Sequence, residues 1–341
     1  MGIWVERKIA GFIQDRLGPM EVGYKGLLQT VADVIKLLQK EEIIAEGIDK
    51  KVFLAAPVII FVSIFSGLAM IPLAPDVIGS ASKVGVFYII AIISLDVIGL
   101  LLAGWSSYNK YSVYGALRAV AQIISYEVPL GLCILSMVIF AQTLDLQEMC
   151  FQQSVFAEDI NLFGLTGIDV TGKGFLTWNI IQFPLSFILL IIYFISTLAE
   201  SNRAPFDLPE ADAELIAGIQ TEYGGFRWSV IALGEYSMMF LTGLLGSVLF
   251  FGGWSTPLPN IGSIELATWT SGELGTLSAY IWGVFWTLAK ISVWIFVQMW
   301  VRWTYPRLRI DQLMHLSWKV LTPFSMVMII VASIWKMLSI S

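Results

Sequence analysis

Four ionisable side chains lie inside stretches that are otherwise strongly apolar: Asp96, Glu127, Glu235 and Lys290. A charge at the bilayer centre costs roughly 2.5–3.5 kcal/mol on insertion scales, so four such groups facing lipid would cost on the order of 10 kcal/mol. We therefore expect them to face a bundle interior, water or one another. Buried carboxylates can load and release protons near neutral pH. The set favours a proton path, although any single member is also compatible with a structural pair.

A second group of acids lies between two apolar stretches, in and just before "NRAPFDLPEADAELIAGIQTEYGG", residues 202–225. Only Arg203 offsets these acids before Arg227. The acids are Glu200, Asp207, Glu210, Asp212, Glu214 and Glu222. Like charges that share a helix face repel each other and titrate as a coupled group. The row is suited to a proton reservoir beside a membrane, and a solvated acidic loop without a function is the simpler alternative.

The acidic segment also carries signals for a short helix. Asp207 is a suitable N-cap with Glu210 three residues later, as in a capping box. The pair Gly224–Gly225 marks the end of the helix, which is predicted to run to about Tyr223. In the apolar stretch 119–143, Glu127 precedes Pro129. That proline is expected to break its helix and to free backbone groups for water.

The elements that must position these groups are membrane helices. Hydrophobic residues make up 57% of the 341 residues and charged ones only 13%, and mean hydropathy is +0.77. Soluble domains carry about 25% charged residues, and a membrane-spanning helix needs roughly 20 apolar residues. The chain has seven such stretches, at about 53–73, 85–105, 119–143, 178–199, 228–252, 278–301 and 320–339. The sequence predicts an all-α integral membrane protein, a bundle of about seven transmembrane helices forming a single membrane domain over residues 1–341. We expect no soluble domain and no removable signal peptide.

Positive charge predicts the orientation of the bundle. Residues 1–52 carry eight Lys and Arg, and residues 302–319 carry four. The loops expected on the opposite side hold only Lys83 and Lys173. The positive-inside rule places residues 1–52, the acidic loop (200–227) and the last loop (302–319) in the cytoplasm or matrix. The acids therefore face the side where soluble partners lie.

Residues 24–41 predict an amphipathic helix that lies in the membrane interface. Apolar residues recur with helical spacing at Leu27, Leu28, Val31, Val34, Ile35 and Leu38. The segment is too polar to span a bilayer and suits the interface. A surface helix with one solvated face and a passage for an amphiphile moving between lipid and protein explain the pattern equally well.

Cysteine and histidine are too few for redox or metal chemistry by this chain alone. The chain has two cysteines and one histidine, whereas an iron–sulfur centre needs about four thiolates and a zinc site a full ligand set. No phosphate-binding glycine loop is present. We expect no metal site, no redox cofactor held by this chain and no nucleic-acid partner. His315 is taken to be an ordinary interfacial residue.

Four segments resemble the quinone-site membrane subunit of respiratory complex I, the H-type subunit of NADH–quinone oxidoreductases, and they occur in the order of that family. The segments are "ERKIAGFIQDRLGPMEVGYKGLLQTVADVIKLLQKE", "ALRAVAQIISYEVPL", "ESNRAPFDLPEADAELIAGIQTEYGGFRW" and "YPRLRIDQLMHLSWK". The resemblance covers nearly the whole chain. Family members usually have eight spanning helices, including one before the ERK motif, where this chain has only "MGIWV".

The resemblance implies a role for each matching residue. The implied quinone chamber takes Glu6, Arg7, Arg16, Asp33, Lys36, Arg203, Phe206 and Asp207. The implied proton path takes Glu127, Glu200, Glu210, Asp212, Glu214, Glu222 and Glu235, with Arg118 as a possible charge partner. Docking of the soluble arm is implied for Arg302, Arg307, Arg309 and Asp311.

The resemblance also implies partners and a location. The substrate would be a quinone, and iron–sulfur clusters and FMN would lie in partner subunits. Hydrophilic-arm subunits, small membrane subunits and antiporter-like subunits would be neighbours. The expected location is the bacterial cytoplasmic (inner) membrane, with the mitochondrial inner membrane as the alternative.

Three other functions remain open at this point. A secondary ion transporter also needs acids and lysine within the membrane, but it predicts inverted repeats and paired broken helices, which the sequence lacks. The membrane subunit of an energy-converting hydrogenase would share the acids without a quinone chamber. A purely structural anchor for a soluble arm would tolerate neutral replacements of the acids within the membrane.

Overall fold

A computed structural model describes residues 2–157, 160, 162–164, 170–209, 216–260 and 265–340 of the chain. Throughout these residues the regular secondary structure is helical, without a β-strand. Six helices are long and apolar enough to cross a membrane. They are α3 (Lys50–Leu68), α4 (Gly85–Ser106), α5 (Lys110–Ala141), α10 (Gly225–Phe251), α12 (Leu277–Thr304) and the helical run Ile310–Leu338. The prediction of an all-α membrane protein is confirmed.

The predicted span at 178–199 is interrupted. It begins with the short helix α7 (Asn179–Gln182), and the longer helix α8 (Ser186–Glu200) follows after a break at Phe183–Leu185. Pro184 lies in the break. Because proline has no N–H and disfavours helical geometry at the residue before it, α7 does not continue into α8. The apolar helix α8 has 15 residues, shorter than the other six.

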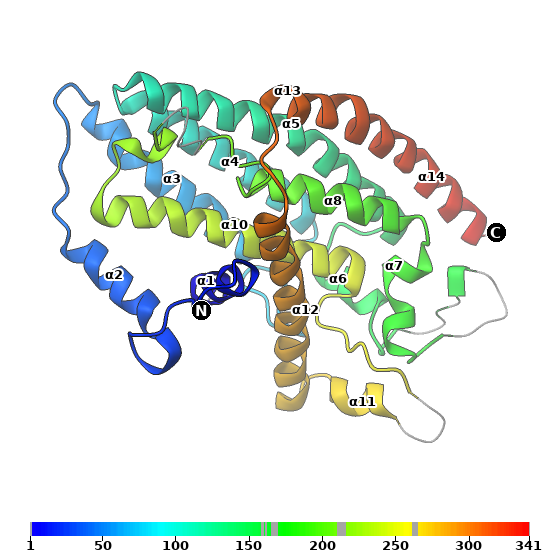
Figure 1. The fold of residues 1–341 in the computed structure, drawn as a ribbon. Helices are drawn as coiled ribbons and strands as arrows, with labels where there is room; N and C mark the ends of the chain where they lie inside the picture. Colours follow the sequence, from blue (N-terminus) through cyan, green and yellow to red (C-terminus); the bar gives the residue numbers. More distant parts are fainter. Residues whose placement is uncertain are drawn as a thin grey trace.

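The long helices pack as neighbours around one continuous core (Figure 1). Helix α3 packs against α4, and α5 packs against α4, α8 and α14 (Thr322–Ile340). Helix α10 lies against α3, α8 and α12, and in Figure 1 α12 runs across the direction of α10. Small residues allow the close approach: a Cβ at Gly99 would lie 2.6 Å from Ile60 Cγ1.

Pro129 does not break its helix, contrary to the expectation from the sequence. Helix α5 continues through it. A proline at this position cannot donate a hydrogen bond to the carbonyl four residues earlier, which belongs to Ser125. The hydroxyl of Ser317 donates to that carbonyl instead. The freed backbone group is thus satisfied by a side chain from the π-helical segment Leu316–Leu321 rather than by water.

Helix α3 shows the same arrangement at Pro57. The carbonyl four residues earlier is that of Phe53, and it accepts a hydrogen bond of 3.2 Å from the Tyr223 hydroxyl. The rings of Phe53 and Tyr223 also stack, with centroids 4.1 Å apart. Tyr223 closes the acidic segment, so this contact attaches the segment to a membrane helix.

Two short helices precede α3. Helix α1 (Gly2–Ile13) carries Glu6 and is seen end-on in Figure 1, beside α12. The predicted amphipathic helix is present as α2 (Gln29–Gln39), shorter than 24–41, and a 3-10 turn (Tyr24–Gly26) lies before it. No residue of α2 is buried. Its apolar side chains, Val31, Val34, Ile35 and Leu38, are exposed in this chain.

The remaining short elements lie in the connections between the long helices. Helix α6 (Leu146–Gln152) and helix α11 (Leu266–Ser271) are α-helical, and α13 (Ile310–His315) precedes the π-helical segment. Short 3-10 turns cover Leu162–Gly164 and Gly174–Thr177.

The predicted helix from Asp207 to Tyr223 is wrong over the part that the structure describes. Residues 207–209 are not helical, and beyond residue 215 the chain forms turns and one 3-10 element, Gly218–Thr221. Ile216 and Gly218 have φ values of +65° and +51°, which an α-helix does not allow. Tertiary packing explains the difference, because the segment lies against α5. A Cβ at Gly115 would stand only 2.9 Å from Gly218 Cα.

Candidate functional site

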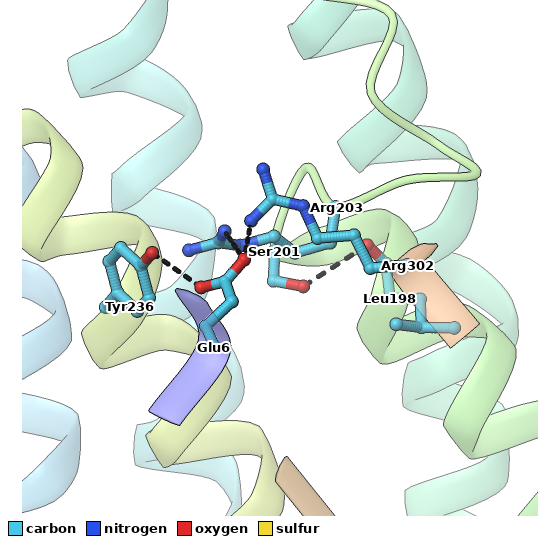
Figure 2. A network of polar contacts seen from close by, with 6 residues as sticks. All are labelled: Glu6, Leu198, Ser201, Arg203, Tyr236 and Arg302. Atoms are coloured by element: carbon cyan, nitrogen blue, oxygen red, sulfur yellow. Dashed lines mark hydrogen bonds and ion pairs between the residues drawn. The ribbon is translucent and has the colours of Figure 1, made fainter. Parts of the chain in front are cut away.

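One buried cluster joins four distant parts of the chain around Glu6 (Figure 2). The Oε1 atom of Glu6 pairs with Arg302 and lies 3.4 Å from Nη1 of Arg203. The Tyr236 hydroxyl donates a 2.6 Å hydrogen bond to Oε2 of the same carboxylate. These residues come from α1, α12, the acidic segment and α10, so the cluster fixes the segment that follows α8 against two membrane helices.

Burial makes the cluster electrostatically strong. The side chains of Glu6 and Arg203 are only 6% and 7% exposed, and that of Arg302 is 27% exposed. The Arg203 guanidinium lies 4.1 Å from the centre of the Tyr236 ring. Burial lowers the pKa of Arg203, but the negative charges of Glu6 and Glu235 raise it, and the net shift is upward. Arg203 therefore stays positively charged, and one carboxylate serves two guanidiniums.

A polar cavity opens beside this cluster. Its volume is about 390 Å³. The polar lining comes from Glu6, Arg7, Arg16, Tyr236 and Arg302, and the rest of the wall includes Trp303 and Pro19. The volume lies within the usual range of roughly 300–1,000 Å³ for small-molecule pockets.

A second, mostly apolar cavity of about 350 Å³ adjoins the first. The two cavities share Arg16, Leu17 and Gly18 as lining residues. The second one is otherwise lined by Trp4, Lys8, Phe12, Met20 and Lys25. A polar chamber thus lies next to an apolar one at the N-terminal helices, an arrangement that suits an amphiphilic molecule.

Three of the N-terminal residues implied by the resemblance, Glu6, Arg7 and Arg16, line these cavities. Arg7 pairs with Asp33 of α2 at 2.7 Å, and both side chains are partly exposed. Lys36 is exposed on α2, away from the residues that line either cavity. The Arg7–Asp33 pair connects α2 to α1 at the edge of the polar cavity.

The motif "NRAPFDLPE" contributes unequally to the site. Arg203 belongs to the cluster, whereas Phe206 is buried against Tyr126, with ring centroids 5.2 Å apart. Asp207 pairs with Arg307 at 3.3 Å. Burial raises the pKa of Asp207, and the positive charges of Arg307 and Arg302 oppose that shift without cancelling it. The acidic segment is therefore held to the connection between α12 and α13 by an ion pair.

The acids within the membrane are distributed along several helices. The hydroxyl of Ser94 on α4 donates to Oε1 of Glu127 on α5. Glu200, the last residue of α8, is 1% exposed. Further along, Gln220 donates to Glu235 at 3.2 Å.

The remaining implied residues are placed as follows. The Asn109 amide donates to Glu222 at 2.7 Å. Arg118 is half-buried in the first half of α5. Arg309, just before α13, and Asp311, in its first turn, are exposed. Glu210, Asp212 and Glu214 lie outside the described residues. Arg302, grouped by resemblance with the docking residues, lies in the Glu6 cluster instead of on an open surface.

The sequence did not predict the roles of two residues, Tyr236 and Lys290. Tyr236 directly follows Glu235, and its tyrosine side chain gave no signal by itself. Lys290 was grouped with the acids of a proton path. Its ammonium donates to the carbonyls of Phe251, Gly253 and Ser255 at 2.6, 2.8 and 2.7 Å. Because these carbonyls lie at and just beyond the end of α10, Lys290 is a cap for that helix.

No group of three or more His, Cys, Asp or Glu side chains suited to a metal ion occurs within the described ranges. The long apolar helices and the buried charged cluster define the class of the protein: a multi-pass helical membrane protein with ionisable groups in its interior.

Comparison with known proteins identifies the family within that class. A profile of the NADH dehydrogenase family matches residues 1–333. The second H-type subunit of the NADH-quinone oxidoreductase of Cytophaga hutchinsonii is 55% identical over 341 residues, which cover 98% of this chain and 93% of the relative. The H-type subunit of the same enzyme from Chlorobaculum tepidum is 49% identical over 334 residues, with 98% and 87% covered. The chain belongs to the NADH dehydrogenase family of membrane subunits.

Proposed function

We propose that this chain, as a membrane subunit of complex I, forms part of the chamber that receives the quinone and couples quinone reduction to proton translocation. Its relatives are named as subunits of NADH–quinone oxidoreductase, a multisubunit oxidoreductase. Subunits of the hydrophilic arm would supply the electrons from iron–sulfur clusters and FMN. The small and antiporter-like membrane subunits would carry the coupling onward, in the cytoplasmic membrane of a bacterium.

The observation that carries this proposal is the pair of adjoining cavities beside the Glu6 cluster. A quinone has a polar head and an apolar tail, and the cavities offer a polar space next to an apolar one. Exposed apolar side chains on α2 lie in the same N-terminal region. This supports the interpretation of α2 as part of a passage from the lipid.

The charges of the site suit the reaction. Reduction of a quinone transiently places negative charge in a chamber of low dielectric constant, where fixed positive groups stabilise it strongly. Arg302 and Arg16 line the polar cavity, and Arg203 lies next to it in the cluster. When negative charge appears there, Glu6 competes with it for the same guanidiniums.

That competition offers a route to coupling. The Glu6 cluster fixes Arg203, and Arg203 is the start of the acidic segment. If Arg203 moves or loses its pairing with Glu6, the electrostatic environment of the acids that follow it along the chain changes. The environment of Glu235 changes as well, because its charge acts on Arg203. Protons would then redistribute among the carboxylates that the resemblance names, from the acidic loop toward Glu127.

Substitutions in the loop test the chamber. Arg203→Ala and Asp207→Ala should impair quinone reduction by the assembled enzyme. Arg203 pairs with Glu6, which lines the polar cavity, and Asp207 fixes the same segment to Arg307. Assembly is followed on native gels, and NADH–ferricyanide activity, which bypasses the quinone, reports on the hydrophilic arm. Lys50→Ala, an exposed charge at the start of α3, is the matched control. Unaltered quinone kinetics in assembled Arg203→Ala and Asp207→Ala enzymes would contradict the proposal.

Neutral replacements within the membrane test the coupling. Glu127→Gln and Glu235→Gln should reduce proton translocation per NADH oxidised more than they reduce assembly. Translocation is measured as acidification in sealed vesicles or proteoliposomes. A purely structural anchor predicts full pumping in both variants, so that result would eliminate the carboxylate path.

A further inference from the structure

A buried aspartate that the family resemblance does not name lies near the middle of α4. Asp96 is 7% exposed, and its Oδ1 atom is buried without a hydrogen-bond partner among the described residues. Buried polar atoms are almost always satisfied by protein or ordered water. An orphaned carboxylate oxygen at this depth therefore needs an explanation.

Glu200 has the same property in a stronger form. It is 1% exposed, and neither of its carboxylate oxygens has a partner in the described part of the chain. The charges of Glu127 and Asp96 both act on Glu200. Asp96 of α4 and Glu127 of α5 are thus close enough to Glu200 of α8 to influence it electrostatically.

Two polar contacts hold these helices in register around the acids. Ser94, two residues before Asp96 along α4, donates to Glu127 on α5. Five residues before Glu127, the Gln122 amide donates at 2.8 Å to the carbonyl of Ala199, the neighbour of Glu200. These contacts hold α5 against α4 near Asp96 and against α8 next to Glu200.

No positive side chain forms an ion pair with any of the three acids within the described ranges. Lys290, the lysine in the middle of α12, gives its hydrogen bonds to the carbonyls at the end of α10. The other Asp, Glu, His, Lys and Arg side chains on the helices packed here are Lys50 and Lys51 of α3, Lys110 and Arg118 of α5, Arg227 and Glu235 of α10, Asp311 and His315 of α13, Lys319 of the π-helical segment, and Lys336 of α14.

Simple electrostatics limits the charge that such a group can carry. Several neighbouring carboxylates in a low-dielectric interior cannot all be ionised, and their titrations are coupled. Orphaned acceptors are satisfied when a neighbour is protonated and donates, or when a water bridges them. A cluster of this kind gains a proton when negative charge appears nearby and releases one when positive charge arrives.

We propose that Asp96, Glu127 and Glu200 form one proton-sharing carboxyl cluster, and that Asp96 is an additional member of the proton path of this protein. The inference rests on the proposed coupling function and extends it to a residue on α4. In this arrangement Glu200 connects to the acidic segment that begins directly after it, and Asp96 extends the path into the bundle.

Infrared difference spectroscopy of the assembled enzyme tests the proposal directly. Spectra are taken on NADH-driven reduction, with the enzyme labelled with ¹³C at aspartate carboxyls. A protonated aspartate gives a carbonyl band that shifts with this label, whereas a glutamate band does not. We expect such a band, its loss in Asp96→Asn, and its displacement in Glu127→Gln. Asp76→Asn, an exposed aspartate in the connection between α3 and α4, is the matched control.

Proton translocation provides the second readout. Asp96→Asn should lower translocation per NADH oxidised, whereas Asp96→Glu, which keeps a proton-binding group, should restore it. An unchanged band and unchanged translocation in Asp96→Asn, while Glu127→Gln lowers translocation, would overturn the inference and leave the proposed function standing. Full translocation in Glu127→Gln would instead contradict the proposed function. If Asp96→Asn does not assemble, the labelled band in Glu127→Gln decides: displacement supports the cluster, and no change refutes it.

Discussion

Replacing Glu6 by Gln tests whether the buried cluster at the cavity holds the fold together through charge. The substitution keeps size and shape but removes the negative charge shared by Arg203 and Arg302. Removing one partner of a buried ion pair typically costs about 3–5 kcal/mol. The lower end applies here, because the Arg302 side chain is 27% exposed and water screens part of its charge.

Tyr236→Phe removes a smaller share of the same cluster. The lost interaction is the 2.6 Å hydrogen bond to Oε2 of Glu6. A hydrogen bond to a charged group contributes about 1.5–3 kcal/mol, against about 0.5–1.5 kcal/mol for a neutral pair. The phenylalanine ring keeps the contact with the Arg203 guanidinium, so the loss is confined to the hydroxyl.

A double-mutant cycle connects the two substitutions. In the Glu6→Gln background the tyrosine hydroxyl donates to a neutral amide, so Tyr236→Phe should cost about 1 kcal/mol less than in the parent, a coupling typical of residues in contact. The assay is the rate of heat inactivation of the purified complex at one temperature, converted to differences in activation free energy. Lys50→Gln is the control for loss of one charge. Additive effects, or a Glu6→Gln enzyme that inactivates no faster than the control, would refute the reasoning.

Three further substitutions probe separate parts of the architecture. Lys290→Met removes the donor from the carbonyls at the end of α10 and should cost about 1–3 kcal/mol for each carbonyl left unsatisfied, seen as less assembled complex on native gels. Normal yield would show that the cap is dispensable. Tyr223→Phe leaves the Phe53 carbonyl unsatisfied and should cost about 1–3 kcal/mol, with faster heat inactivation than a Tyr24→Phe control at an exposed tyrosine. Arg307→Gln removes a positive charge that lowers the pKa of Asp207, so this pKa should rise further. The acid limb of the pH profile of quinone reduction should then move to higher pH. An unmoved limb would show that ionised Asp207 is not required.

The length of the apolar stretches predicted the long helices well, because a helix that spans the lipid needs roughly 20 mostly apolar residues. Every described long helix falls on a predicted stretch, and α2 falls on the predicted amphipathic segment. The exceptions have local or tertiary causes. Pro184 splits the stretch 178–199, which a count of apolar residues overlooks. Packing of Gly218 against α5 overrides the capping signals of the acidic segment, and no local pattern contains that contact.

The effect of Pro129 depended on a partner that lies far away along the chain. The proline does free a backbone carbonyl, as the sequence indicates, but the donor is Ser317, 192 residues after Ser125. The same holds at Pro57, where Tyr223 is 170 residues from Phe53. Sequence reasoning identifies the backbone group that needs a partner. Only the fold determines whether water or a side chain provides it. At Pro129 the side chain comes from the π-helical segment Leu316–Leu321, and at Pro57 it comes from the end of the acidic segment.

For the charged residues within the apolar helices, too, the sequence shows that a partner is needed but not which partner the fold provides. Lys290, Asp96 and Glu127 looked equivalent in the sequence, as charges that must avoid lipid. The structure separates them by their partners: the ammonium has three carbonyl acceptors, whereas Asp96 and Glu200 have buried oxygens without a donor in the described part of the chain. The three hydrogen bonds of Lys290 stabilise the end of α10. A proton shared between buried acids supplies the hydrogen bond that their unsatisfied oxygens lack. Proton transfer in this protein is therefore expected where Asp96 of α4, Glu127 of α5 and Glu200 of α8 lie.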